Sequence, residues 1–153
     1  MDVHADRQDA ADTSQARAAW NLIFLCWLVA MVSTLGSLFF SEVMELPPCE
    51  LCWYQRIFMF PLAIILTVGL LPFDRHIVRY ALPLAIAGWL AAMYHYLLYS
   101  GFIPETLRPC SQDVPCSKVN LELFGFITIP LLSLFSFSIM VVLLLIVRRR
   151  ASQ

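Results

Sequence analysis

The chain has 153 residues, of which 60% are hydrophobic and only 14% are charged, and its formal net charge is −1. A soluble domain carries roughly 25% charged residues, so this composition argues against a soluble globular protein. We expect the lipid bilayer, and not a nucleic acid, as the main partner of so apolar a chain.

Four apolar runs follow a polar N-terminal segment. Residues 1–19 are polar, carry four aspartates and show no apolar periodicity, so we expect a disordered cytoplasmic tail. A helical membrane span needs about 20 mostly apolar residues. The runs that meet this requirement are 20–40, 53–71, 77–99 and 121–147. Because the runs are continuous and do not alternate in polarity, they predict helices. The fold class is therefore an all-α integral membrane protein, a four-transmembrane-helix bundle over 20–147 with a basic tail at 148–153.

The distribution of basic residues predicts the orientation in the membrane. Lys and Arg favour short cytoplasmic segments. The loop between the first two spans has neither residue, whereas the arginines gather in the N-terminal tail, in the loop between spans two and three and at the C-terminus (Arg7, Arg17, Arg75, Arg79, Arg148, Arg149 and Arg150). We therefore expect both termini to be cytoplasmic and the cysteine-bearing loops to be extracytoplasmic.

Four of the five cysteines form two close pairs in these outer loops. Cys49 and Cys52 lie in Pro-Cys-Glu-Leu-Cys, and Cys110 and Cys116 lie in the loop before span four. A C-x-x-C pair closes a very small ring and is typical of thiol–disulfide exchange, whereas structural disulfides usually close longer loops. The pattern favours redox chemistry at Cys49–Cys52 and leaves a structural disulfide open for Cys110 and Cys116. The fifth cysteine, Cys26, lies inside the first span and is interpreted as a small apolar residue.

Cys52 is expected in the first turn of the second helix, because an apolar run begins directly after it. Free backbone amides and the positive end of the helix dipole would favour its thiolate there. Arg56 follows four residues later on the same helix face and adds a permanent positive charge. The sequence thus predicts a lowered thiol pKa at Cys52.

Two ionisable side chains lie inside the spans near the outer boundary. Arg56 is near the start of span two and His95 is near the end of span three, each about 6 Å from the boundary at the helical rise. Ionisable residues in a span usually mark function, although snorkelling of Arg56 and ordinary packing of His95 are the bland alternatives. Two polar groups at one depth favour a site for a quinone, which has ring carbonyls and an apolar chain.

These features resemble the DsbB/BdbC family of disulfide-bond formation proteins. The resemblance is carried by Cys-Glu-Leu-Cys-Trp-Tyr-Gln-Arg (Cys49 to Arg56), by the late histidine of span three, and by the paired-cysteine loop. Phe-Gly-Phe-Ile-Thr-Ile-Pro, from Phe124 to Pro130, is similar to the start of the family's fourth helix. The resemblance covers nearly the whole chain from about Trp20.

The resemblance implies an enzyme, a disulfide-generating protein-dithiol:quinone oxidoreductase of the bacterial cytoplasmic membrane. A thioredoxin-fold partner, a DsbA/BdbD-like oxidase, would pass electrons to the Cys110–Cys116 disulfide, with Cys110 taking the partner. Cys116 would then attack Cys49 of the C-x-x-C disulfide, and the freed Cys52 would donate to a membrane quinone.

In this scheme Arg56 and His95 bind the quinone, which is either menaquinone or ubiquinone. Only five residues separate Cys110 from Cys116, whereas the better-known proteobacterial members have a much longer loop. The short spacing is similar to that of the BdbC branch.

The cysteine pattern is also compatible with other functions. The outer cysteines could form a zinc site or purely structural disulfides, although the neighbouring arginine and an oxidising compartment argue against zinc, and we expect no metal. CcdA-like reductant carriers place their cysteines within the spans, and vitamin K epoxide reductases place their C-x-x-C in the final span. A transporter is disfavoured because no acidic partner for Arg56 or His95 lies well inside the spans.

Overall fold

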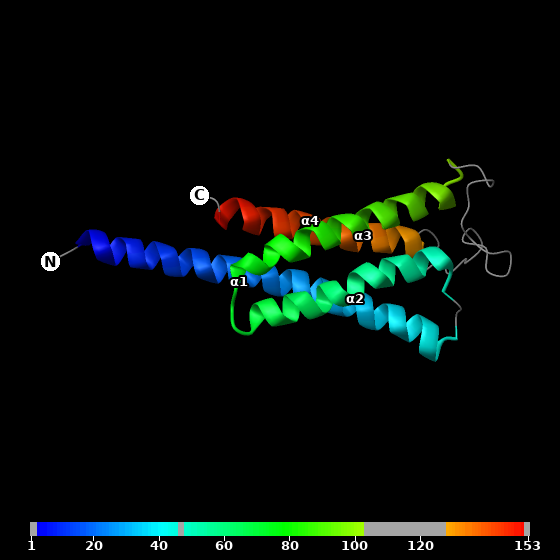
Figure 1. Cartoon of the computed structure of the whole chain (residues 1–153), viewed down its shortest axis with the longest axis horizontal. Coiled ribbons are helices and arrows are strands. Elements are labelled where there is room, and N and C mark those ends of the chain that lie inside the picture. Colours follow the sequence, from blue (N-terminus) through cyan, green and yellow to red (C-terminus); the bar gives the residue numbers. More distant parts are fainter. Residues whose placement is uncertain (1–2, 46–47, 103–127, 152–153) are drawn as a thin grey trace.

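A computed structural model describes residues 3–45, 48–102 and 128–151, and in these ranges its regular elements are all helices. In chain order they are α1 (Val3–Leu38), the π-helical η1 (Phe39–Val43), α2 (Glu50–Leu70), the short 3₁₀ helix η2 (Arg75–Ile77), α3 (Val78–Tyr99) and α4 (Ile129–Ala151) (Figure 1).

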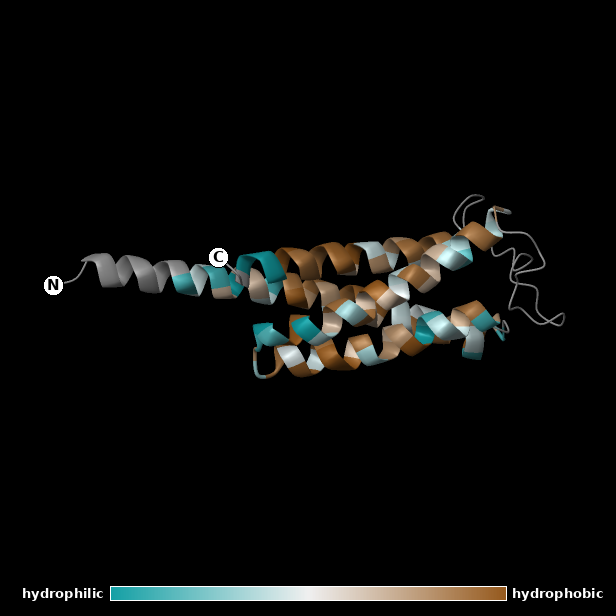
Figure 2. Cartoon of the chain, turned by 45° about the horizontal axis from the view of Figure 1, so that its top comes forward, coloured by the Kyte–Doolittle hydropathy of each residue, from teal (hydrophilic) through white to brown (hydrophobic). Residues whose placement is uncertain are grey.

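Four of the helices are long and apolar enough to cross a membrane. Their most apolar windows have mean hydropathies between 1.4 and 2.7, and apolar colour covers most of the bundle in Figure 2. Large apolar side chains point outward from every helix, for example Val32, Ile64 and Phe135, each more than 60% exposed. Lipid would cover such a surface, because soluble monomers rarely expose so much contiguous apolar area. The predicted all-α membrane fold is confirmed.

The N-terminal segment differs from the prediction. Residues 3–19, expected to be disordered, form the first turns of α1, a helix of 36 residues. Five of the ten residues 10–19 are alanine, the best helix former, and the membrane span that follows supplies the costly nucleus onto which such a segment can extend. Low hydrophobicity and charge do not exclude a helix that a neighbouring span has already nucleated.

The ends of α2 and α3 lie within three residues of the spans 53–71 and 77–99, whereas α1 begins at Val3, well before the predicted span 20–40. The second helix begins at Glu50, three residues before the predicted span, and the third ends at the predicted Tyr99. Helix α4 begins at Ile129, whereas the prediction starts at 121; residues 121–127 lie outside the described ranges.

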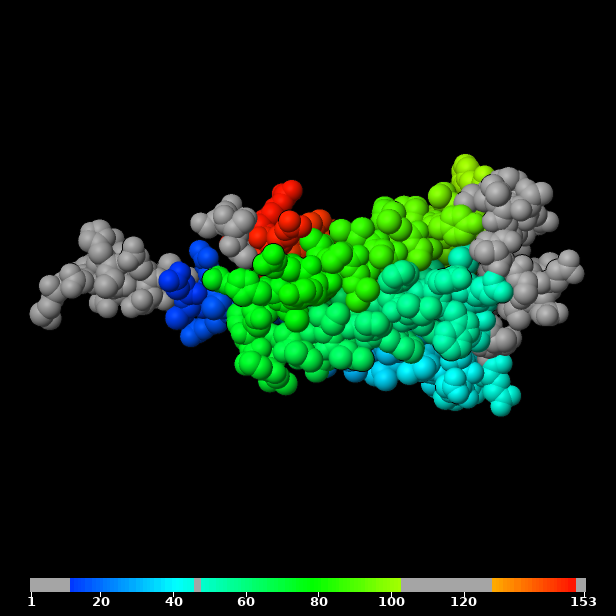
Figure 3. Space-filling view, viewed as in Figure 1, coloured from blue at the N-terminus to red at the C-terminus, as the bar shows by residue number. Residues whose placement is uncertain are grey.

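The four helices form a closed ring in which α1 and α3 each pack against α2 and α4. Figure 3 shows α2 and α3 side by side on one face, with the blue turns of α1 projecting beyond the end of the bundle. The chain ends of α1 and α4 lie at one end of the bundle, and the start of α2 lies at the other (Figure 1). The central core consists of fully buried apolar side chains: Ile23, Cys26 and Ala30 of α1, Leu62 and Leu66 of α2, Ala81 and Ala85 of α3, and Phe137, Met140 and Leu144 of α4.

The contact between α3 and α4 is unusually close at one point. A Cβ atom placed on Gly88 would overlap the ring of Phe137, which is fully buried. The next residue, Trp89, donates its indole N–H to Ser138 Oγ at 2.9 Å. Small residues let membrane helices approach until van der Waals contact and an interhelical hydrogen bond hold them. This contact holds α3 against α4.

Candidate functional site

The C-x-x-C pair lies where α2 begins. Cys49 is the N-cap residue, with an extended backbone (φ −68°, ψ 163°), and Cys52 is in the first turn. Pro48, which precedes them, cannot donate a backbone hydrogen bond, so the helix starts only after it. Residues three apart share a helix face, and the two sulfurs lie 3.2 Å apart as a hydrogen-bonded thiol pair. The structure therefore describes the reduced state of this pair.

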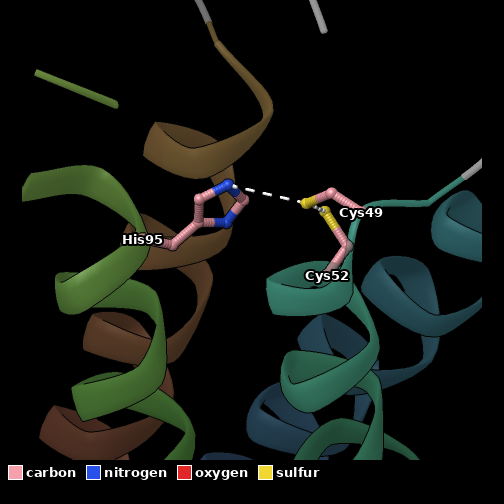
Figure 4. Close-up of side chains that lie close together, drawn as sticks. All are labelled: Cys49, Cys52 and His95. Atoms are coloured by element: carbon pink, nitrogen blue, oxygen red, sulfur yellow. Dashed lines mark hydrogen bonds between the residues drawn. The ribbon is translucent and has the colours of Figure 1, made fainter. Parts of the chain in front are cut away.

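His95 of α3 points at Cys49 across the contact between α2 and α3, as Figure 4 shows. Its Nε2 lies 3.8 Å from Cys49 Sγ, and its Nδ1 lies 3.0 Å from the side-chain nitrogen of Gln55. His95 and Gln55 are 2% and 7% exposed, and they are the buried polar side chains of the described residues. The histidine is thus tied on both ring nitrogens, one of them to a reactive sulfur.

The electrostatics favour a thiolate at Cys49. Its pKa is lowered from 9.0 to about 4, chiefly because the thiolate accepts a hydrogen bond from Cys52, and also because it faces His95; burial opposes both effects. The prediction assigned the lowered pKa to Cys52, on the grounds of the helix dipole and Arg56. The tertiary contact with His95, which no local sequence pattern encodes, stabilises the thiolate of Cys49 instead.

Arg56 is held by the first helix. Its Nε donates to Ser37 Oγ at 2.7 Å and its Nη2 donates to the Ser37 carbonyl at 2.8 Å. Ser37 lies where α1 gives way to the π-helical η1, a local irregularity of the kind that recurs at functional sites. The guanidinium also lies 5.7 Å from the centre of the Trp53 ring, within cation–π range. These contacts hold the Arg56 guanidinium at one depth in the bundle. A side chain that only snorkelled to the membrane interface would not need them.

A cavity of about 330 Å³ opens beside the two sulfurs, between α1, α2 and α4. Its polar lining on α2 consists of Cys49, Cys52, Gln55 and Arg56. Serines of α1 and α4 add hydroxyls, and the remaining wall is mainly apolar and aromatic (Val32, Phe40, Met59, Phe60, Leu132 and Phe137). Small-molecule sites have this composition, an apolar wall with a few convergent polar groups, and volumes of about 300–1,000 Å³.

The structure brings together four of the six predicted site residues. Cys49 and Cys52 touch each other, Arg56 shares their cavity, and His95 contacts Cys49 but is not among the described residues that line the cavity. Cys110 and Cys116 lie outside the described residues. Gln55 was missed by the sequence reasoning, although a glutamine inside a span beside Arg56 is itself a signal, because a polar group in lipid needs a partner.

The same side chains are also a possible metal-ligand set. The donor atoms of Cys49, Cys52 and His95 all lie within 4.8 Å of one another. Two thiolates and an imidazole suit zinc, but oxidation of the cysteines to a disulfide would remove two of the three ligands.

Comparison with known proteins identifies the family. A family model described as "Disulfide bond formation protein DsbB" matches residues 16–147. The chain belongs to the DsbB family. A "Probable disulfide formation protein" of Metapseudomonas resinovorans is 49% identical over 134 residues, covering 87% of this chain and 93% of that protein. "Disulfide bond formation protein C" of Bacillus subtilis is 41% identical over 133 residues, covering 86% of this chain and 95% of that protein.

A third relative, a "Probable disulfide formation protein" of Coxiella burnetii, is 44% identical over 121 residues, which is 77% of this chain and 81% of the relative. No solved structure matches the chain significantly. The predicted resemblance to the DsbB/BdbC family is therefore confirmed, and with it a multi-pass membrane protein of disulfide bond formation.

Proposed function

We propose that the protein is a membrane thiol:quinone oxidoreductase that reoxidises an extracytoplasmic dithiol oxidase. The observation that carries the proposal is the position of Cys49 and Cys52 on the wall of an apolar cavity that also holds one guanidinium. Electrons from a dithiol need an acceptor within reach of the sulfur, and this cavity has the size and polarity to admit one from the membrane.

A quinone fits the residues that line this cavity. A quinone supplies an acceptor for two electrons and two protons, by which it becomes a quinol. Arg56, fixed by Ser37, presents N–H donors of the kind that a ring carbonyl accepts. The apolar wall suits a substituted ring and the first part of an isoprenoid chain. Both menaquinone and ubiquinone share these features.

The cysteines act in sequence in the proposed reaction. A thioredoxin-fold partner reduces the Cys110–Cys116 disulfide, with Cys110 forming the mixed disulfide. Cys116 attacks Cys49, which breaks the Cys49–Cys52 bond and frees the Cys52 thiolate. The second thiol of the partner releases Cys110 from the mixed disulfide, and Cys110 attacks Cys116, which re-forms the Cys110–Cys116 bond and frees Cys49. The Cys49–Cys52 disulfide then re-forms as its two electrons pass through Cys52 to the quinone. One partner dithiol and one quinone become one disulfide and one quinol, so electrons and protons balance.

The proposal places the cysteine end of the bundle outside the bacterial cytoplasmic membrane and both termini in the cytoplasm. At the other end of the bundle, Arg75, Arg79 and Arg148 surround a second cavity. Such an excess of arginine is typical of the cytoplasmic side. Cysteine scanning with a membrane-impermeant maleimide tests this orientation. Cysteines introduced at the C-x-x-C end of the bundle should be labelled from outside intact cells, and those introduced at the arginine-rich end should not. The reverse labelling would show the reversed orientation.

A quinone-reduction assay tests the function. The purified full-length protein is mixed with a reduced thioredoxin-fold oxidase and a soluble quinone, and the quinone absorbance is followed. We expect the wild type and Cys26→Ala to consume quinone, because Cys26 is buried in the central core. Cys52→Ala and Cys110→Ala should be inactive. Activity in Cys110→Ala would show that the partner reaches the C-x-x-C pair directly, and inactivity of the wild type with every quinone and partner would overturn the proposal.

A metal site is the second candidate, because three donor atoms converge at Cys49, Cys52 and His95. Metal analysis of the reduced, purified protein separates the two functions. One tightly bound zinc per chain that survives addition of quinone would favour the metal site, whereas quinone-dependent loss of the two thiols would favour the redox site.

A further inference from the structure

Among the described residues, His95 makes two polar contacts, both to residues of the α2 end that line the cavity, and does not line the cavity itself. In the described residues the cavity is lined from α1, α2 and α4, whereas His95 belongs to α3. Its ring reaches Cys49 Sγ through Nε2 and Gln55 through Nδ1. Cys49 touches both the histidine and the cavity, so the sulfur lies between the imidazole and any molecule bound there.

Burying the polar side chains of His95 and Gln55 costs free energy unless their hydrogen bonds are satisfied. A polar group removed from water without a partner costs about 1–3 kcal/mol in proteins. His95 and Gln55 are almost fully buried, and each satisfies the other across the α2–α3 contact. An apolar pair would pack there without such a requirement, so the two polar groups need an explanation in the chemistry of Cys49.

We propose that His95 is the acid–base partner of Cys49 and that Gln55 is the positioning residue that aims His95 Nε2 at the sulfur. This inference rests on the proposed thiol:quinone function and deepens it. The role differs from the one that the sequence suggested for His95, which was contact with the quinone.

The carboxamide of Gln55 suits both protonation states of the histidine. With its nitrogen toward Nδ1, as the structure has it, Gln55 donates to Nδ1, so the single proton of a neutral imidazole lies on Nε2 and points at Cys49. After a half-turn of the carboxamide, its oxygen accepts from Nδ1–H, so the lone pair of a neutral ring lies on Nε2 and can take the Cys49 proton. One side chain thus holds the ring in the same orientation before and after proton transfer.

The proton balance is as follows. In the tautomer with its proton on Nδ1, His95 takes the proton of Cys49–SH on Nε2, which leaves a thiolate beside an imidazolium. When the Cys49–Cys52 bond forms, two S–H protons and two electrons leave the dithiol. The Cys52 proton and the proton held on His95 are the two that the quinol requires, and His95 returns to the neutral form.

Other charged and titratable groups lie near this pair on the same two helices. On α2 they are Cys52, Glu50 and Arg56, and on α3 Tyr94 packs against the Cys49 cluster. Among these groups, His95 is the one whose ring nitrogen contacts Cys49 Sγ from α3.

Alkylation of Cys49 tests the pairing without any quinone or partner. The reduced full-length protein is treated with iodoacetamide between pH 4 and pH 9, and modification of Cys49 is followed by peptide mass spectrometry. We expect His95→Phe and Gln55→Met to raise the apparent pKa of the Cys49 profile by about one unit, so that the Cys49 rate falls about fivefold at the pH where half of the wild-type thiol is ionised. Gln55→Glu, which can still accept from Nδ1, should restore most of the rate.

Thr34→Val is the matched control, since it also replaces a polar by an apolar group inside a span. Thr34 Oγ1 is buried without a hydrogen-bond partner among the described residues, and Thr34 does not line the cavity. Its Cys49 profile should equal that of the wild type. Wild-type profiles in both His95→Phe and Gln55→Met would overturn the inference.

Steady-state kinetics separates the two roles of His95. A partner of Cys49 predicts a lower kcat in Gln55→Met and His95→Phe, with the quinone KM within about twofold of the wild type. A quinone ligand predicts a raised KM with an unchanged kcat, which would overturn the inference. If the wild type reduced no quinone but the alkylation shifts were present, the proposed function would fail while the pairing of His95 with Cys49 would stand.

Discussion

The two contacts that α3 makes with its neighbours serve different ends. Against α4 it presents Gly88 and Trp89, which let the helices approach closely and lock with a single hydrogen bond. Against α2, near the cysteines, it presents His95, whose two ring nitrogens meet Gln55 and Cys49. The α3–α4 contact brings two helices close together, whereas the α3–α2 contact places a histidine beside a reactive sulfur. Substitutions in the first should therefore change stability, and substitutions in the second should change turnover.

The largest effect is expected from Cys49→Ala. Loss of a residue that acts as a covalent relay typically removes most of the rate, so quinone reduction should fall by at least about 10³-fold. At pH 4, where the Cys49 thiolate no longer contributes to stability, the melting temperature in detergent should change little, because the pair lies at the end of α2 and outside the central core. A variant that lost activity only in proportion to its unfolded fraction would contradict this separation.

Gly88→Leu should have the opposite signature. Its side chain would collide with the buried ring of Phe137, and overpacking costs about 1–3 kcal/mol or more. We expect a clear drop in the melting temperature in detergent. Thiol exchange of the folded fraction with a reduced partner, measured without quinone because Phe137 also lines the cavity, should stay near that of the wild type. Phe137→Ala in the same chain makes room for the new side chain and should recover part of the loss. Full wild-type stability of Gly88→Leu would show that the α3–α4 contact is looser than described.

Arg56→Lys tests whether the charge alone is sufficient at the cavity. Lysine cannot reproduce the two parallel bonds that the guanidinium makes to Ser37. A hydrogen bond to a charged group is worth about 1.5–3 kcal/mol, so the quinone KM should rise about tenfold or more. The rate at which a reduced partner protein exchanges with the cysteines, measured without quinone, should stay near that of the wild type.

The pH dependence of stability should report the thiolate of Cys49. Its pKa is about 4 in the folded protein against 9.0 for the free side chain, so its contribution is complete above pH 9 and is lost as the pH falls toward 4. The reduced wild type should therefore gain thermal stability relative to Cys49→Ala between pH 5 and pH 8. The oxidised protein has no such thiolate, so the same comparison under oxidising conditions should show no trend.

Ser138→Ala is expected to have the smallest effect. It removes the acceptor of the Trp89 indole, and interhelical hydrogen bonds in membrane proteins average about 0.6 kcal/mol. Reversible unfolding in detergent should show a loss of this order, with unchanged quinone reduction. A loss of several kcal/mol would mean that this hydrogen bond, and not the close approach at Gly88, holds α3 to α4.

The sequence predicted the fold well because lipid leaves a chain few choices. A run of about 20 apolar residues must form a helix to satisfy its own backbone, so the four spans could be read from composition alone. The N-terminal segment was the exception. Its polarity pointed to disorder, whereas its alanines and the adjoining span carry α1 back to Val3. Local composition does not report a helix nucleated from outside the segment.

The site was predictable only in part. Cys49, Cys52 and Arg56 are close in sequence at helical spacing, so their proximity follows from the motif. The sequence also singled out His95, since an ionisable residue in a span is costly, but it suggested the quinone as the partner. Only the packing of α3 on α2 decided that His95 faces Cys49 and that Gln55 completes the contact. Helix pairing within a bundle depends on side chains far apart in the chain, and no local periodicity encodes it.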